Sequence, residues 1–249
     1  MSVIGTFTPA KDGGWNGSIH GGATIVRATD YGETFTTGIA LFRAIPAVPF
    51  LPARNRTTFD LQETYGKLTS PVIPQTAPPS PAAVTLTSIF HSDAERDEYF
   101  SPRFYALAQT TFDHNYSQGL DLQQMYGGGL GWTVYKTAAA ELDVKAAVSY
   151  IHQNFSESAS NESLIGSTFA EIYTRKFQHG VVLNEQISAT PAWNDTNAYF
   201  ATGSVSLTLP VHKRLGISVT SLDTFLNDPP PGFRKNSFQF TAGLTYALK

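Results

Sequence analysis

Long stretches of two-residue alternation run through nearly the whole chain, and this pattern restricts its possible folds more than any other feature. Successive side chains of a β-strand point to opposite faces, so each stretch predicts a strand with one apolar and one polar face. The clearest example is C-terminal, where Phe238, Phe240, Ala242, Leu244, Tyr246 and Leu248 alternate with Ser237, Gln239, Thr241, Gly243, Thr245 and Ala247. Helical periodicity is almost absent. The sequence therefore predicts an all-β protein.

The alternation divides the chain into roughly twelve predicted strands, many of them longer than the usual 5 or 6 residues. They cover residues 14–28, 33–45, 54–66, 82–90, 102–114, 119–136, 138–155, 162–177, 180–193, 197–210, 214–226 and 236–248. Short basic turns follow the sixth, eighth and tenth strands, whereas longer polar loops follow the third, seventh, ninth and eleventh. One end of the molecule is thus expected to carry tight turns and the other end larger loops. Residues 92–99 are expected to form the only helical turn, at the tight end.

Twelve long strands of this kind could form a soluble sandwich with apolar faces inward, or a membrane barrel with apolar faces toward lipid. Three observations favour the barrel. The strands reach the roughly 9 to 11 residues that a tilted bilayer crossing needs. The polar faces carry Gly, Gln, Thr and mixed charges, not a Lys/Glu-rich surface. Aromatic residues gather near strand ends, as in interfacial girdles, at Trp15, Trp132, Tyr135, Tyr150, Phe155, Tyr173, Phe177 and Trp193. The predicted fold is a single antiparallel transmembrane β-barrel of about 12 strands.

Composition excludes several classes of function. A net charge of −3 does not provide the excess of basic residues that nucleic-acid binding requires. The absence of cysteine excludes disulfides, thiolate nucleophiles and Cys-ligated metals. Charged residues make up only 15% of the chain, against about 25% in soluble domains. The longest charge-free run, 68–90, contains five prolines and cannot be a spanning helix.

The resemblance to a known family rests on four places in the chain. They are Gly14-Trp15-Asn16-Gly17-Ser18, the run from Arg96 to Tyr105 (RDEYFSPRFY), the run from Gln118 to Trp132 (QGLDLQQMYGGGLGW), and Asn227 to Gly232 (NDPPPG) followed by Gly243-Leu244-Thr245-Tyr246. In their order and spacing these segments resemble the salt-induced outer-membrane protein family, a bacterial family of uncertain function. The resemblance implies a secreted precursor, a barrel in the outer membrane of a Gram-negative bacterium, and no catalytic residues to transfer.

Two features depart from that family. The N-terminus lacks the basic and apolar regions of a secretory signal, so we expect that a signal peptide has been removed. The terminal Leu248-Lys249 lacks the final aromatic residue typical of barrel-assembly signals. We expect residues 1–13 to form an N-terminal segment and residues 14–249 the barrel domain. The expected partners are outer-membrane lipids, small solutes or ions, and the barrel-assembly machinery during insertion.

Nine charged residues are expected to face the lumen: Asp60, Arg103, Asp113, Asp121, Glu141, Asp143, Lys145, Glu171 and Arg175. They could form a ring that selects ions or solutes, or a network in which carboxylates and cations satisfy one another across the barrel. The network is the better interpretation, because an open aqueous channel is typical of about 16 to 18 strands. The lumen is therefore expected to be narrow, polar and lined by charges.

Other chemistry has weaker support. A lipid-modifying hydrolase would need serine paired with a base, and His114 and His152 lie near a strand end without forming a recognisable motif.

No HExxH pattern, HxH pair or carboxylate-rich loop indicates a metal, and no cofactor is expected. The glycines of Gly127-Gly128-Gly129-Leu130-Gly131 lie within a strand, so they are expected to provide curvature or room for a bulky Tyr or Arg neighbour, not a phosphate loop.

The sequence thus predicts an outer-membrane barrel whose role is structural or the restricted passage of small solutes or ions, with a connection to osmotic or salt conditions implied by the resemblance. A lipid-modifying hydrolase and a soluble ligand-binding β protein remain alternatives.

Overall fold

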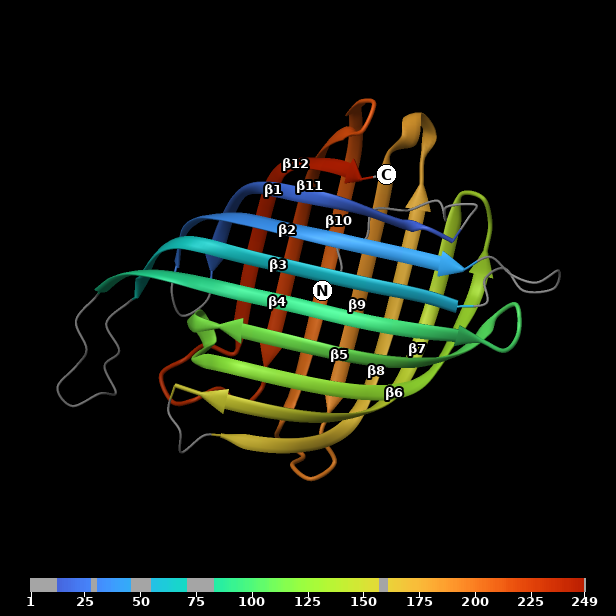
Figure 1. Ribbon diagram of the computed structural model, residues 1–249. Helices are drawn as coiled ribbons and strands as arrows, with labels where there is room; N and C mark the ends of the chain where they lie inside the picture. Colours follow the sequence, from blue (N-terminus) through green and yellow to red (C-terminus); the bar gives the residue numbers. More distant parts are fainter. Residues whose placement is uncertain (1–12, 28–30, 46–54, 71–82, 157–160, 249) are drawn as a thin grey trace.

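The computed structural model describes residues 13–27, 31–45, 55–70, 83–156 and 161–248, and these form one closed antiparallel barrel (Figure 1). Its strands are β1 (Trp15–Arg27), β2 (Tyr31–Ile45), β3 (Asn55–Ser70), β4 (Ala83–Tyr99), β5 (Phe104–Asn115), β6 (Leu120–Lys136), β7 (Ala140–Phe155), β8 (Glu162–Lys176), β9 (Val182–Pro191), β10 (Tyr199–His212), β11 (Leu215–Leu226) and β12 (Asn236–Leu248). Each strand pairs with its sequence neighbours, and β1 closes the barrel on β12. The predicted all-β, twelve-stranded antiparallel barrel is confirmed.

In Figure 1, strands β1 to β6 cross obliquely in front of β9 to β12, as the tilted strands of a closed barrel must. No helix in the described part of the chain is long and apolar enough to cross a membrane. The only helical elements there are two 3₁₀ turns, η1 (Tyr116–Gln118) and η3 (Gln178–Gly180).

The expectation of a helical turn over residues 92–99 is wrong, because these residues form the second half of β4. Residues 92–98 pair with β3, and residues 92–99 pair with β5. The dense charges of this segment alternate between the two faces of the strand. Asp93, Glu95 and Asp97 face the barrel interior, whereas Arg96 and Glu98 are exposed. A strand can carry so many charges because one of its faces lines a polar interior.

The two faces of the barrel wall have opposite character. Outward positions carry large apolar side chains, such as Phe35 and Leu130, which are 58% and 59% exposed. Inward positions carry buried polar groups, such as Thr36, Gln123 and Ser149. This arrangement is the reverse of a soluble domain, in which large apolar side chains are buried and polar ones exposed. The alternating residues of each strand therefore place their polar face toward the barrel interior and their apolar face outward.

Threonine and serine hydroxyls link neighbouring strands on the inner face. Thr24 hydrogen-bonds to Thr36 on β2 and to Thr241 on β12, and Thr36 also bonds to Thr64 on β3. A second series joins β7, β8 and β9 through Ser149, Thr168 and Thr190. These bonds provide partners for hydroxyl groups whose burial without hydrogen bonds would cost about 1–3 kcal/mol each.

An even number of strands brings the start of β1 and the end of β12 to the same end of the barrel, which we call the terminal end. The connections 100–103, 137–139, 177–181 and 213–214 also lie at this end. The opposite end, which we call the loop end, carries η1 and the longer connections 192–198 and 227–235. Residues 1–12 of the expected N-terminal segment (1–13) and residues 157–160 of the loop between β7 and β8 lie outside the described residues. Of the Pro-rich connection expected over residues 67–81, residues 67–70 belong to β3 and the others also lie outside the described residues.

Candidate functional site

The barrel encloses a cavity of about 550 Å³, lined by residues from most of the strands. Its lining is rich in amides, hydroxyls and charged groups, including Gln62, His91, Gln123, Thr168, Gln186 and Ser204. A cavity of this volume falls within the 300–1,000 Å³ range of small-molecule sites. Two groups of ionisable side chains project into the interior, one near the terminal end and one farther inside.

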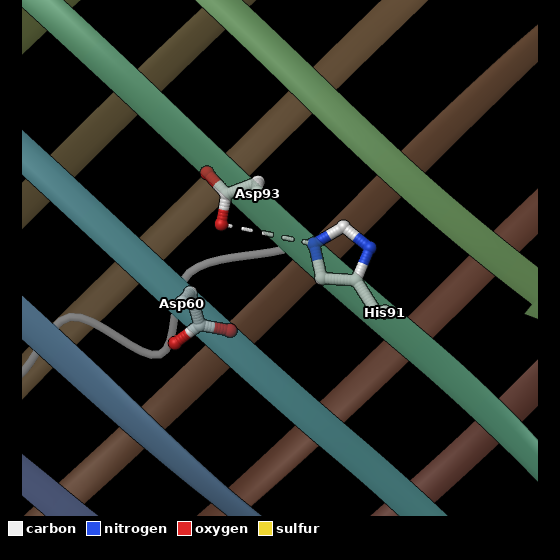
Figure 2. A group of neighbouring side chains, drawn as sticks. All are labelled: Asp60, His91 and Asp93. Carbon is white, nitrogen blue, oxygen red and sulfur yellow. Dashed lines mark ion pairs between the residues drawn. The ribbon is translucent and has the colours of Figure 1, made fainter. Parts of the chain in front are cut away.

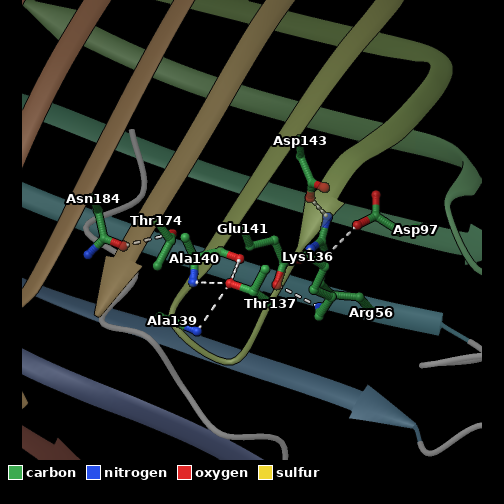
Figure 3. A network of polar contacts seen from close by, with 10 residues as sticks. All are labelled: Arg56, Asp97, Lys136, Thr137, Ala139, Ala140, Glu141, Asp143, Thr174 and Asn184. Atoms are coloured by element: carbon green, nitrogen blue, oxygen red, sulfur yellow. Dashed lines mark hydrogen bonds and ion pairs between the residues drawn. The ribbon is translucent and has the colours of Figure 1, made fainter. Parts of the chain in front are cut away.

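Arg56 is the centre of the first group, near the start of β3 (Figure 3). Its guanidinium donates from Nε to Asp97 at 2.7 Å and from Nη2 to Asp143 at 3.1 Å, and Nη1 lies 3.7 Å from Glu141. The side chains of Asp97 and Asp143 are only 1% and 4% exposed. Strands β4, β5 and β6 separate β3 from β7 in the wall. The ion pairs to Asp143 and Glu141 therefore cross the interior.

Two tyrosine rings flank the same guanidinium. The Arg56 Cζ atom lies 5.9 Å from the centroid of the Tyr99 ring and 5.3 Å from that of Tyr105, within the range of cation–π attraction. Gly131 leaves the space that the Tyr105 ring occupies, since a Cβ atom at this position would overlap the ring. This agrees with the expectation that the glycines of β6 make room for a bulky neighbour.

Lysines complete the charge balance near the terminal end. Lys145 on β7 pairs with Glu95 on β4, and both side chains are about nine-tenths buried. Lys136, at the end of β6, pairs with Glu141 at 2.6 Å, and both groups are more exposed. Together with the ion pairs of Arg56, the Lys145–Glu95 pair ties β3 and β4 to β7 through the lumen rather than through the wall.

The second group consists of Asp60, His91, Asp93 and Asp113, which we call the His91 cluster. Asp60 on β3 is paired directly with Asp93 on β4, and His91 on β4 is paired directly with Asp113 on β5. The imidazole Nδ1 lies 2.5 Å from Asp113, and Nε2 lies 3.8 Å from Asp93. Figure 2 shows one ring nitrogen facing Asp93 and Asp60 and the other turned away from them.

The structure places the nine sequence-predicted lumen charges in different environments. Asp60, Asp113, Glu141, Asp143 and Lys145 point into the barrel and belong to the two groups. Arg103 lies exposed in the 100–103 turn, and Asp121 is exposed near the start of β6.

Glu171 and Arg175 are also exposed, at outward positions of β8. The inward positions of this part of β8 are Ala170, Ile172 and Thr174, which line the cavity. The apolar outward face of β8 ends at Phe169, so the two charged residues belong to the exterior near the terminal end. Here the more polar residues occupy the outer face, the reverse of the pattern elsewhere in the barrel.

Most of the aromatic residues expected in a girdle are exposed near the barrel ends. Trp15, Trp132, Tyr135 and Tyr173 lie toward the terminal end, and Tyr150 and Trp193 lie toward the loop end. Near the terminal end, Trp132 stacks on Phe104 with ring centroids 5.9 Å apart. Phe155 differs from the others, because it is buried inside the loop end with Leu120 and Leu226.

Several functional groups were missed by sequence reasoning: Arg56, His91, Asp93, Glu95, Asp97 and Tyr105. Four of them lie on β4, whose second half was interpreted as helical. The available signal was the alternation itself, since His91, Asp93, Glu95, Asp97 and Tyr99 occupy every second position. Arg56 carried no local signal, because its partners lie on distant strands.

Of the two histidines considered for hydrolysis, His152 takes an outward position on β7, whereas His114 is half-buried at the end of β5 and also borders the cavity. His152 Nδ1 lies 2.9 Å from the Ser163 hydroxyl, in a direct cross-strand pair near the loop end. Among the described residues, no carboxylate hydrogen-bonds to His152. His114 instead contacts the backbone carbonyl of Asp121 through Nδ1 at 2.8 Å. A serine–histidine pair thus exists at the outer surface, without an orienting acid in the described part of the chain.

Comparison with known proteins relates this barrel to outer-membrane channels by fold. The NanC porin superimposes with a TM-score of 0.54 at 5% sequence identity, over 93% of this chain and 100% of the porin. An outer membrane channel from Pseudomonas putida F1 gives a TM-score of 0.54 at 10% identity, over 100% of both chains. No relative is found among the curated protein sequences. The profile of DUF481, a protein family of unknown function, matches residues 55–248, and the chain therefore belongs to the DUF481 family.

Proposed function

We propose that the protein is a channel of the bacterial outer membrane that passes small polar solutes or ions through a narrow lumen. The observation that carries this proposal is the inverted barrel, apolar outside and polar inside, around a cavity of about 550 Å³. The apolar exterior suits contact with lipid. Closure of the barrel also leaves no strand edge with unpaired backbone groups, which a lipid environment requires. The shared fold with outer-membrane channels supports the same location.

The charged groups suggest a preference for cations. The described residues that point inward include the carboxylates Asp60, Asp93, Glu95, Asp97, Asp113, Glu141 and Asp143 and the cations Arg56, Lys136, Lys145 and Lys176. An excess of carboxylates favours cations in a pore. The ion pairs of Arg56 cross the interior near the terminal end, so they narrow the path and limit the size of the solute.

Single-channel recording in planar bilayers tests this proposal. The purified barrel should insert from detergent, migrate in a heat-modifiable way on gels, and give stepwise conductance with cation preference. An Arg56→Met variant that retains the heat-modifiable migration should show larger steps, because the cross-lumen ion pairs are gone. Absence of conductance from correctly folded protein would refute a channel. A protein that remains monodisperse without detergent would refute the membrane location.

The expected partners and the connection with salt belong to this proposal. Outer-membrane lipids would contact the apolar exterior, and the barrel-assembly machinery would insert the chain. A role in osmotic or salt conditions rests on the sequence resemblance alone. Comparing the amount of protein in outer membranes from bacteria grown at low and high NaCl tests it, and an unchanged amount would contradict salt induction.

A second candidate function is lipid hydrolysis at the His152–Ser163 pair, favoured by its 2.9 Å contact on the outward face. Deacylation of phospholipid or lipopolysaccharide by the purified barrel tests this activity. The activity should disappear in Ser163→Ala and persist in a Ser167→Ala control, which also lies on β8. Wild-type protein without deacylation would rule out this candidate.

A further inference from the structure

We propose that Asp60, His91 and Asp93 bind a divalent transition-metal ion such as Zn²⁺ inside the barrel. Each residue offers one donor atom, and these atoms all lie within 4.8 Å of one another. Asp60 is fully buried, whereas His91 and Asp93 are partly exposed to the cavity. The site goes beyond the proposed channel function, and its occupancy can be measured without any conductance.

The strand register itself places two like charges together. Asp60 and Asp93 are direct cross-strand partners, and both point to the inner face of the barrel. Like charges directly opposite one another destabilise a sheet. A divalent cation between the two carboxylates would convert this repulsion into attraction, and Figure 2 shows both carboxylates on the same side of the His91 ring.

The surroundings of the imidazole provide an independent observation. Its Nδ1 atom contacts Asp113 at 2.5 Å, and Asp113 accepts a second hydrogen bond from the Gln123 amide at 3.1 Å. Gln123 in turn accepts a hydrogen bond from Gln153 at 2.6 Å. Donation from Nδ1 to this fixed carboxylate leaves the lone pair on Nε2. Histidines that ligate metals almost always donate their other ring nitrogen to a carboxylate, carbonyl or water in this way.

The Nε2 atom of His91 points into the cluster. It is buried and has no hydrogen-bond partner among the described residues, and its nearest charged group is Asp93 at 3.8 Å. Zn–N and Zn–O bonds are about 2.0–2.2 Å long, so two ligands of a tetrahedral ion lie about 3.4 Å apart. The 3.8 Å between Nε2 and Asp93 is close to this value, and a separation of 4.8 Å needs a contraction of about 1.4 Å through side-chain rotation.

The donor set distinguishes between classes of metal. One imidazole nitrogen and two carboxylate oxygens suit Zn²⁺ and neighbouring transition metals, whereas Ca²⁺ and Mg²⁺ prefer oxygen ligands only. Three protein ligands would leave a coordination position facing the cavity. If the channel proposal also holds, a metal ion bound there would reduce the passage of other cations.

Isothermal titration of ZnCl₂ into the detergent-solubilised barrel, purified without a polyhistidine tag, tests the site. Wild-type protein should bind one ion per chain. Asp113→Asn should weaken binding by about 10- to 100-fold, the usual effect of removing the carboxylate behind a metal-bound histidine. His91→Gln and Asp60→Asn should weaken it further. His152→Gln removes an outward-facing histidine and should leave the affinity unchanged.

Each variant is first checked for heat-modifiable migration, which reports barrel folding. If Asp60→Asn does not fold, His91→Gln and Asp113→Asn still decide the outcome. The proposal is overturned if folded wild-type protein binds no stoichiometric Zn²⁺, if binding survives unchanged in His91→Gln, or if Ca²⁺ binds as tightly as Zn²⁺. A barrel that binds Zn²⁺ but gives no conductance would refute the channel function and leave this site intact.

Discussion

Replacing Arg56 with methionine tests whether ion pairs across the lumen stabilise the barrel. Methionine retains much of the length of the side chain but leaves Asp97 and Asp143 without their guanidinium partner. Each lost charge-assisted hydrogen bond contributes about 1.5–3 kcal/mol. The 3.7 Å contact to the partly exposed Glu141 adds less than about 1 kcal/mol. Because two nearly buried carboxylates lose their cation, we expect the free energy of unfolding to fall by about 3–5 kcal/mol.

The assay is guanidinium unfolding in lipid vesicles, followed by the fluorescence of the three tryptophans and by heat-modifiable migration. Arg96→Met is the matched control. Arg96 and its partner Glu98 are 43% and 56% exposed, so the loss there should stay below about 1 kcal/mol.

A compensating variant makes the test sharper. Adding Asp97→Asn and Asp143→Asn to Arg56→Met removes the unpaired buried charges and should recover at least half of the lost stability. A loss below about 1 kcal/mol for Arg56→Met alone, or no recovery in the triple variant, would show that these ion pairs do not stabilise the barrel.

Three further tests, two of them with a control substitution, probe the wall of the barrel. Gly131→Val should lower the yield of folded barrel in refolding assays, because its side chain would overlap an adjacent tyrosine ring, whereas Gly203→Val enters open space and should refold normally. Leu130→Lys places a charge on the outward apolar face and should cost about 2–4 kcal/mol in vesicle unfolding. The same charge in Gln186→Lys, on the cavity lining, should cost much less, and equal losses would contradict the assigned faces. Thr36→Val removes a hydroxyl that bonds to two neighbours and should cost about 1–3 kcal/mol by the same measurement, so an unchanged stability would show that the hydroxyl series is dispensable.

The strands could be predicted closely because their signal is local. The apolar and polar faces of β12 follow directly from the alternation between Phe238 and Leu248, and β12 begins and ends within a residue of its predicted bounds. The error in β4 has the same origin. Taken alone, its densely charged residues predict a helical turn over residues 92–99, because a single segment does not reveal that one of its faces is enclosed by the rest of the barrel.

The candidate site could be predicted only in part. Asp60 and Asp143 were expected in the lumen from the polar faces of their strands, but their partners could not be assigned. Arg56 meets Asp143 across the barrel, and the two residues are far apart in sequence. Glu171 shows the opposite difficulty, since its polar character suggested an inward position while β8 turns it outward.

The sequence by itself determined the all-β class, the number of strands, their approximate ends and the apolar character of one face. These features depend on the two-residue period of a strand and on the apolar or polar character of each face. Both can be determined from the order of residues within one segment. Only the tertiary structure decided which charges meet. The pairing of Asp60 with Asp93 depends on the register between β3 and β4, and the contact of Arg56 with Asp143 depends on closure of the barrel. Neither register nor closure is a property of any single segment.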